Sequence, residues 1–261
     1  MVATQFLTSL LLASMALAAP SSSSRHASRL DRRANRQGQP NRRISSPATT
    51  TASNASHVQY SDNWAGAVFD SYPSGTFTAV TGTFTVPTPS GSSGAASAWV
   101  GIDGDTCESA ILQTGVDFTV TDGFVSYDAW YEWYPDYAYD FSGIDISAGD
   151  QITLTVTASS EYTGTAVIEN KSSGQTVTKH IVSLSSLCEE NAEWIVEDFE
   201  EGSSLVPFAD FGTVEFTGAS ATTTAGKSIG PVGATTIDIQ QDLITKTSVS
   251  IGLNSVTVKY V

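Results

Sequence analysis

Several chemically useful residue types are scarce in this sequence, and their scarcity narrows its function. Only two cysteines and three histidines occur among the 261 residues. The motifs H-E-x-x-H and C-x-x-C and the full phosphate-binding loop G-x-x-x-x-G-K-[ST] are absent, as are the Asp-Thr-Gly and Asp-Ser-Gly signatures of pepsin-like peptidases, and G-x-S-x-G occurs only as the short match at residues 226–230. These absences disfavour serine, cysteine, zinc and nucleotide mechanisms. We therefore expect neither a metal nor another cofactor.

Long apolar runs are also lacking, apart from one at the start of the chain. Residues 6–19 form an uncharged apolar stretch that ends in the small-residue sequence Ala16-Leu17-Ala18-Ala19. This pattern is typical of a secretory signal peptide with its cleavage site. No later stretch approaches the roughly 20 consecutive apolar residues that a transmembrane helix needs. We expect residues 1–18 to be a signal peptide and the product to be secreted, extracellular and without a membrane partner.

Positive charge is nearly missing after the first 43 residues. All seven arginines precede residue 44, where Asp31 is the single acid, and the remainder holds five lysines and 26 acidic residues. A surface this acidic repels nucleic acid and anionic membranes. The repulsion between its own acidic side chains weakens when the pH is below about 4, because many carboxylates are then protonated. We expect no nucleic-acid partner and an acidic working pH.

Residues 19–55 contain almost no large apolar side chains and carry the basic charge. Such a segment cannot bury enough surface to fold alone, so we predict a basic, disordered propeptide whose end is uncertain. It would bind the acidic body near neutral pH as an inhibitor and loosen as the carboxylates are protonated. A passive linker is the alternative. The dibasic pair Arg42-Arg43 and self-cleavage nearer Ser56 are both candidate processing points.

Residues 56–261 read as one domain of short strands. Apolar and polar residues alternate with a period of two, Gly, Ser, Asp and Pro clusters separate the runs, and helical periodicity is absent. About 200 residues suffice for one substantial core. We predict an all-β, antiparallel sandwich of the jelly-roll or concanavalin-like kind, and a monomer. Strands are expected, for example, at residues 76–86, 151–158, 165–169, 175–182, 193–199, 213–216 and 255–261.

Two kinds of covalent modification are predicted for the folded body and its border. In an oxidising compartment, an even pair of cysteines favours one disulfide, between Cys107 and Cys188. Asn54 and Asn170 begin N-x-S glycosylation patterns, and the second precedes a turn where a glycan would be tolerated.

The chemistry that remains available uses carboxylates, amides and aromatic rings. A hydrolase can work with carboxylates alone, on glycosidic bonds or on amides. Strand alternation over residues 193–199 places Glu197 on one face with Ile195, and Trp194 on the other. If the first face lines a cleft, desolvation would raise the pKa of Glu197 and let it alternate between acid and base. A solvated glutamate on an exposed face is the alternative.

An ordered set of motifs over residues 63–261 resembles the fungal glutamic peptidases, or eqolisins. Any one of the motifs would be weak evidence, but five or more in order make coincidence improbable. They are N-W-x-G from Asn63, A-W-V-G-I-D-G-D-T-C from Ala98, A-I-L-Q-T-G from Ala110, Y-D-A-W-Y-E-W-Y-P from Tyr127, N-A-E-x-I-x-E-D-F-E from Asn191 and V-P-F-A from Val206.

The resemblance implies a catalytic pair and an activity. The family's glutamine and glutamate correspond to Gln113, in L-Q-T-G, and Glu197, directly before D-F-E. They imply an acid endopeptidase that cleaves proteins and peptides and is insensitive to pepstatin, with the pair on a concave sheet face. Glu197 would activate water and Gln113 would stabilise the oxyanion. Substrate-binding and supporting positions are expected at Trp64, Trp99, Asp103, Asp117, Asp128, Glu132 and Tyr134.

The resemblance further implies a mobile hairpin over the cleft at residues 136–143, for which a plain surface loop is the alternative, and a bridge between Cys107 and Cys188 near the active-site strands. The chain lacks the extra cysteines that some members carry after E-D-F-E-E, which bears on stability and leaves the mechanism unchanged. Two other functions stay open: a non-catalytic carbohydrate-binding sandwich, which would use the same aromatic and acidic cleft, and a glycosidase.

Overall fold

The computed structural model describes residues 35–44 and 58–261, and every regular element in these ranges is a β-strand. The all-β prediction is therefore confirmed. No helix in the described part is long and apolar enough to cross a membrane. The expected signal peptide, most of the expected propeptide, the glycosylation pattern at Asn54 and the processing point near Ser56 lie outside the described residues.

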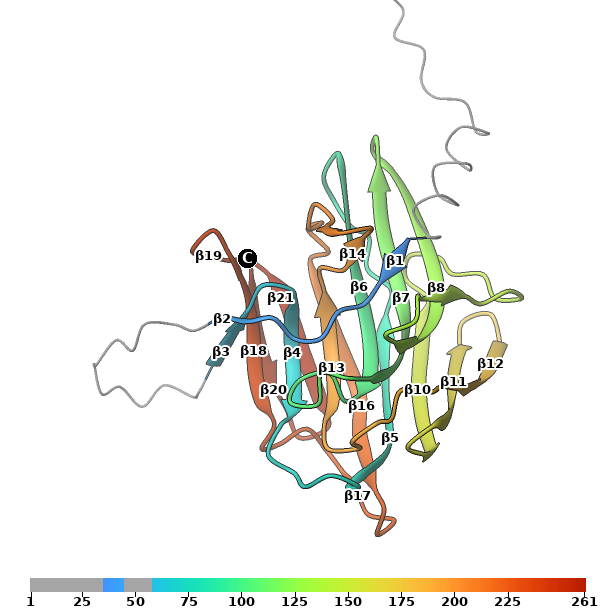
Figure 1. Cartoon of the computed structure of the whole chain (residues 1–261). Coiled ribbons are helices and arrows are strands. Elements are labelled where there is room, and N and C mark those ends of the chain that lie inside the picture. Colours follow the sequence, from blue (N-terminus) through green and yellow to red (C-terminus); the bar gives the residue numbers. More distant parts are fainter. Residues whose placement is uncertain (1–34, 45–57) are drawn as a thin grey trace, which may run out of the picture.

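One large sheet contains ten strands, and β13 and β6 lie near its centre (Figure 1). Its pairs are antiparallel except for β18 with β3. In spatial order the strands are β2 (Arg43–Ile44), β3 (Val58–Ser61), β18 (Thr235–Gln241), β4 (Trp64–Phe69), β13 (Ala192–Glu197), β6 (Ser93–Ile102), β7 (Ile111–Thr121), β8 (Phe124–Tyr134) and β9 (Tyr139–Asp140), with β19 (Ile244–Thr245) paired to β18.

A second sheet of eight strands packs against the first to complete the sandwich. Its order is β12 (Gln175–Val182), β11 (Thr163–Asn170), β10 (Gln151–Ser160), β5 (Phe77–Thr85), β16 (Thr213–Thr223), β21 (Ser255–Tyr260) and β20 (Thr247–Ile251), with β17 (Ser228–Ile229) paired to β16. A small third sheet joins β1 (Arg36–Gln37) to β14 (Glu200–Glu201) and β15 (Ser204–Leu205).

The main core lies between the two large sheets and follows the two-residue alternation of the strands. Trp194 and Val196 of β13 pack into it with Phe84 of β5, and all are almost fully buried. Ile195, on the other side of β13, belongs to a second apolar cluster with Trp64 and Trp99. Burying side chains of this size stabilises the fold by about 1.5–3 kcal/mol each. The predicted division of the two faces of β13 is thus confirmed.

The two predicted modifications have different outcomes. Cys107 and Cys188 form the predicted disulfide across a separation of 81 residues. Asn170 is fully buried at the end of β11, and its Nδ2 donates to the Asp145 carbonyl and to an Asp150 carboxylate oxygen. The prediction that a glycan is tolerated at Asn170 is therefore wrong, because this amide is committed inside the fold.

The N-terminal segment (residues 35–44) lies across the face of the ten-stranded sheet that is turned away from the main core (Figure 1). Its first residues pair with β14 and its last residues pair with β3. The disorder predicted for residues 19–55 does not hold for this segment, because the body supplies the hydrogen bonds and apolar surface that the segment lacks on its own.

Candidate active site

The register of the ten-stranded sheet brings polar side chains from β8, β7 and β13 onto one face, the site face. One row of paired residues crosses four adjacent strands, in the order Glu132 of β8, Gln113 of β7, Gly101 of β6 and Glu193 of β13. Four residues further along β13, Glu197 is aligned through β6 with Asp117 of β7. Because the side-chain period of a strand is two, all these residues point to the same side of the sheet.

Glu197 is fully buried at the end of β13 and is held by two donors. Nε1 of Trp99 donates to its Oε2 at 3.0 Å, and the backbone N–H of Gln39 donates to its Oε1 at 2.9 Å. Burial raises the pKa of Glu197 to about 7, against the lowering effect of the nearby Arg36 charge and of these two hydrogen bonds. The predicted desolvation of Glu197 is confirmed.

Gln113 lies in the middle of β7 and is also fully buried. Neither its side-chain oxygen nor its side-chain nitrogen has a hydrogen-bond partner among the described residues. A buried amide without partners is costly, and it is typical of a site that meets its partner only when a ligand is bound. A Cβ added to Gly38 would lie 2.5 Å from Nε2 of Gln113, so a larger residue at position 38 would require the end of the Gln113 side chain to move.

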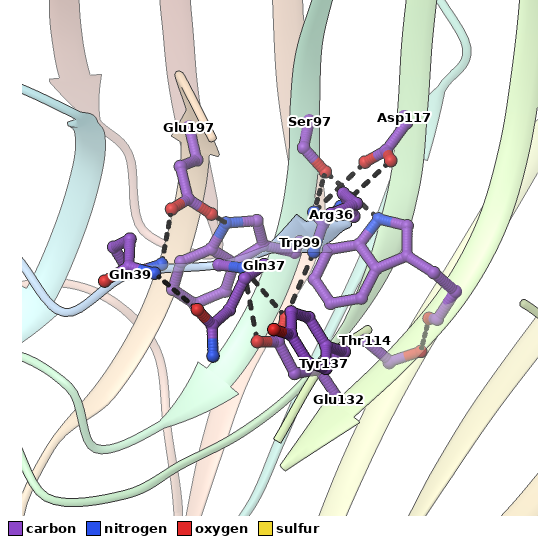
Figure 2. A network of polar contacts seen from close by, with 12 residues as sticks. Arg36, Gln37, Gln39, Ser97, Trp99, Thr114, Asp117, Glu132, Tyr137 and Glu197 are labelled. Atoms are coloured by element: carbon purple, nitrogen blue, oxygen red, sulfur yellow. Dashed lines mark hydrogen bonds and ion pairs between the residues drawn. The ribbon is translucent and has the colours of Figure 1, made fainter. Parts of the chain in front are cut away.

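Arg36 anchors the beginning of the N-terminal segment on the site face, as Figure 2 shows. Its guanidinium makes two hydrogen bonds to Asp117, at 3.0 and 3.1 Å, one to Glu132 at 3.0 Å and one to Ser97 at 3.2 Å. It also lies over the ring of Trp130, 3.7 Å from the centroid. The guanidinium is planar, forms a bidentate pair with a carboxylate and stacks on an aromatic ring, and a lysine ammonium group could not make these contacts.

These carboxylates are buried strongly enough to change their ionisation. Burial raises the pKa of Asp117, and it raises that of Glu132 well above its usual value, while the Arg36 charge lowers both. Glu132 also accepts the backbone N–H of Gly38, at 3.0 and 3.2 Å to its two oxygens. The N-terminal segment therefore supplies a positive charge and backbone N–H donors to these carboxylates.

Four of the predicted substrate-binding residues contact the N-terminal segment or Glu197. Nε1 of Trp64 donates to the Gln39 carbonyl at 2.9 Å, and Trp99, Asp117 and Glu132 make the contacts given above. Trp64 and Trp99 also pack edge to face, with their ring centroids 4.9 Å apart.

The other three predicted residues lie further from these contacts. Asp103, in the left-handed region at φ 71°, accepts the backbone N–H groups of residues 188–191 and so holds the loop that leads into β13. Asp128 is opposite Asp117 on β8 and also borders a separate hollow of about 610 Å³ with Ile144. Tyr134 packs against the apolar cluster on the site face that contains Trp64, Trp99 and Ile195.

Sequence reasoning missed Arg36, Ser97 and Asp105 as site residues. Only the concentration of arginines before residue 44 could have pointed to Arg36, because its partners are 61 or more residues away. Trp130 was also missed, and it is buried on the site face, where Arg36 lies over its ring. Its face was predictable, since Trp130 and Glu132 are two residues apart on one strand.

The hairpin predicted over the cleft is in contact with the N-terminal segment. Gln37 donates from Nε2 to the Pro135 carbonyl at 2.8 Å, and the Ala138 N–H donates to the Arg36 carbonyl at 3.2 Å. The tip of the hairpin therefore touches a peptide bound on the site face. Its mobility stays a prediction.

A desolvated carboxyl group and an unpartnered amide beside an extended stretch of polypeptide are suited to acid–base hydrolysis of peptide bonds. The fold and the site thus define a β-sandwich hydrolase of peptide bonds, and comparison with known protein families gives the same class. Residues 62–260 match the model of the Peptidase A4 family. The chain belongs to this family of glutamic peptidases, or eqolisins.

Named relatives support this assignment over nearly the whole length. The chain is 50% identical to aspergillopepsin-2 from Aspergillus niger, with 98% of each chain covered, and 43% identical to scytalidopepsin B from Scytalidium lignicola, with 94% of each covered. A crystal structure of scytalido-glutamic peptidase with a transition state analog inhibitor has a TM-score of 0.71 at 46% identity, covering 77% of this chain and 98% of that one. Aspergilloglutamic peptidase from Aspergillus niger has a TM-score of 0.62 at 62% identity, covering 64% and 99%.

Proposed function

We propose that the protein is a secreted acid endopeptidase, insensitive to pepstatin, in which Glu197 and Gln113 form the catalytic pair. One observation carries the proposal. Both side chains converge on the same dipeptide, since Glu197 accepts the N–H of Gln39 while Gln113 lies against Gly38. The bound N-terminal segment therefore marks where the peptide bond of a substrate would lie.

The proposed reaction uses one carboxyl group twice. Ionised Glu197 takes a proton from a water molecule as the water oxygen attacks the scissile carbonyl carbon. The amide nitrogen of Gln113 donates a hydrogen bond to the oxygen that becomes negative, and its uncharged state at every pH keeps this donor available. Glu197 then returns the proton to the amine nitrogen as the C–N bond breaks, which leaves a carboxyl group and a free amine.

The acidic working range depends on what covers Glu197. Its pKa of about 7 belongs to the state in which the N-terminal segment excludes water. When the segment leaves and water enters, desolvation decreases, and the pKa moves back toward the ordinary value of about 4.3. Glu197 can then be ionised in mild acid, as the general-base step requires.

The N-terminal segment is proposed to inhibit the enzyme before processing. The Gln39 N–H occupies the Glu197 oxygen that would hold the attacking water, and Arg36 neutralises the carboxylates on either side. The attraction between Arg36 and these carboxylates weakens as acid protonates them. Secretion rests on the apolar N-terminal run and on the disulfide.

Digestion of a denatured protein at about pH 2 to 4, with and without pepstatin, tests this function. The acid-treated protein should release new peptides at the same rate in both samples. Complete inhibition by pepstatin would contradict the proposal. The absence of digestion, together with binding of an oligosaccharide, would favour the carbohydrate-binding alternative, which uses the same aromatic and acidic face.

A further inference from the structure

The carboxylate of Asp105 is buried in the body but has its partners in the N-terminal segment. Its side chain is fully buried. Among the described residues, the partners of its oxygens are Nδ2 of Asn41, at 2.6 Å, and the guanidinium of Arg43. Asp70 adds a second carboxylate, 3.3 Å from the same guanidinium. A buried carboxylate that depends on a removable segment is poorly satisfied once that segment leaves, unless another ligand replaces it.

The body recognises residues 39–43 largely through their main chain. Nδ2 of Asn63 donates to the Pro40 carbonyl, and its Oδ1 accepts the N–H of Arg42. The Asn41 N–H donates to the Gly104 carbonyl at 2.8 Å. Groups that bind main-chain atoms accept any extended peptide, whatever its sequence. An extended substrate of another sequence would therefore find the same main-chain contacts here.

We propose that Asp105, assisted by Asp70, forms a subsite for an arginine or lysine of the substrate, four residues after the residue that supplies the leaving amine. The inference rests on the proposed function. The peptide bond that touches both members of the catalytic pair joins Gly38 and Gln39, so Gln39 is position 1 on the leaving-group side and Arg43 is position 5. The substrate class is thus an extended peptide with a basic residue at position 5.

The pairing of β2 with β3 fixes which side chain reaches this subsite. Arg43 is opposite Ser61 and Ile44 is opposite Tyr60. Side chains alternate along a strand, so a one-residue shift turns the basic group to the other side. Arg42 shows this alternation, because its guanidinium contacts Glu200 instead of Asp105. Preference for a basic residue should therefore depend sharply on position.

The experiment uses the full chain after acid treatment and a set of peptides with one cleavable bond. A single arginine is moved through positions 3 to 7 on the leaving-group side, with glutamine elsewhere, and the products are identified by mass. We expect kcat/KM to be about tenfold higher with arginine at position 5 than at position 6, as for a charge-assisted pair that is only partly exposed. In the Asp105→Asn variant the two peptides should be cleaved at similar rates.

Glu215→Gln is the matched control, because it removes an exposed carboxylate from β16 in the other sheet. This variant should keep the full preference for arginine at position 5. Equal cleavage of all the peptides by the unsubstituted enzyme would overturn this inference and leave the proposed function intact. Failure to cleave any of them would overturn both. A preference that survives Asp105→Asn would also contradict the proposed subsite.

Discussion

Replacing Arg36 by glutamine should weaken retention of the N-terminal segment in a strongly pH-dependent way. The guanidinium is almost fully buried between Asp117 and Glu132, whose side chains are 9% and 0% exposed. Removing one partner of a buried ion pair costs about 3–5 kcal/mol, because the remaining charges stay uncompensated. At about 1.4 kcal/mol for each factor of ten, the dissociation constant should rise by about two to three and a half orders of magnitude.

The sign of the pH dependence follows from the carboxylates. Burial raises the pKa of Asp117 and Glu132 overall in the bound state, and the Arg36 charge partly offsets this, so the contribution of Arg36 is fully present only where these carboxylates are ionised. That contribution disappears as the pH falls through their pKa values. The loss caused by Arg36→Gln should therefore be large at about pH 7.5 and small at about pH 3.

The dissociation constants at about pH 7.5 and about pH 3 are measured with a synthetic peptide that has the sequence of residues 35–44 and is added to acid-treated enzyme. Tryptophan fluorescence is the readout, because Arg36 lies over Trp130. The Arg36→Lys peptide is the matched control, and it should lie between the other two because it keeps the charge without the bidentate geometry. Equal affinity of the arginine and glutamine peptides at about pH 7.5, or an equal loss at both pH values, would contradict this electrostatic role of Arg36.

Three further predictions concern stability. Replacing Cys107 and Cys188 by serine together should lower the free energy of unfolding by about 4.5 kcal/mol in the chain-entropy model for a loop of 81 residues, measured by urea titration; an unchanged midpoint would contradict this. Asp103→Asn should cost about 2–4 kcal/mol in the same assay, because an amide group replaces an oxygen that accepts two backbone N–H groups. Asn170 should carry no glycan, and Asn170→Gln should lower the thermal midpoint because it disturbs the buried amide. A decrease in mass on enzymatic deglycosylation that is seen in the unsubstituted protein and not in the variant would show that Asn170 is glycosylated.

The strands and their faces followed from local patterns. Alternation of apolar and polar residues was enough to predict β12 at its observed bounds and to assign Glu197 and Trp194 to opposite sides of β13. The position of Gln113 came from the resemblance in L-Q-T-G, because nothing in its spacing distinguishes it from other strand glutamines. Its buried and unpartnered amide became visible only in the fold.

The contacts that complete the site face could not be predicted locally. Arg36 meets Asp117 across 81 residues and Glu132 across 96 residues, and sequence periodicity carries no information over such separations. Asn170 illustrates the opposite error, since its N-x-S pattern is local while the partners that bury it, at residues 145 and 150, come from another loop. Glu193 is fully buried, without hydrogen bonds to its carboxylate among the described residues, and strand alternation alone does not distinguish it from Glu197.

This similarity makes Glu193 the best control for the proposed catalytic role of Glu197. The decisive measurement is kcat for peptide cleavage at about pH 4 by Glu197→Gln and Glu193→Gln, with folding checked by circular dichroism. Both changes place an amide at a fully buried position on the same face of β13. We expect kcat to fall by at least about 1000-fold in Glu197→Gln, which removes the proton-transfer group, and by less than about tenfold in Glu193→Gln. Comparable activity in the two variants would contradict this role of Glu197.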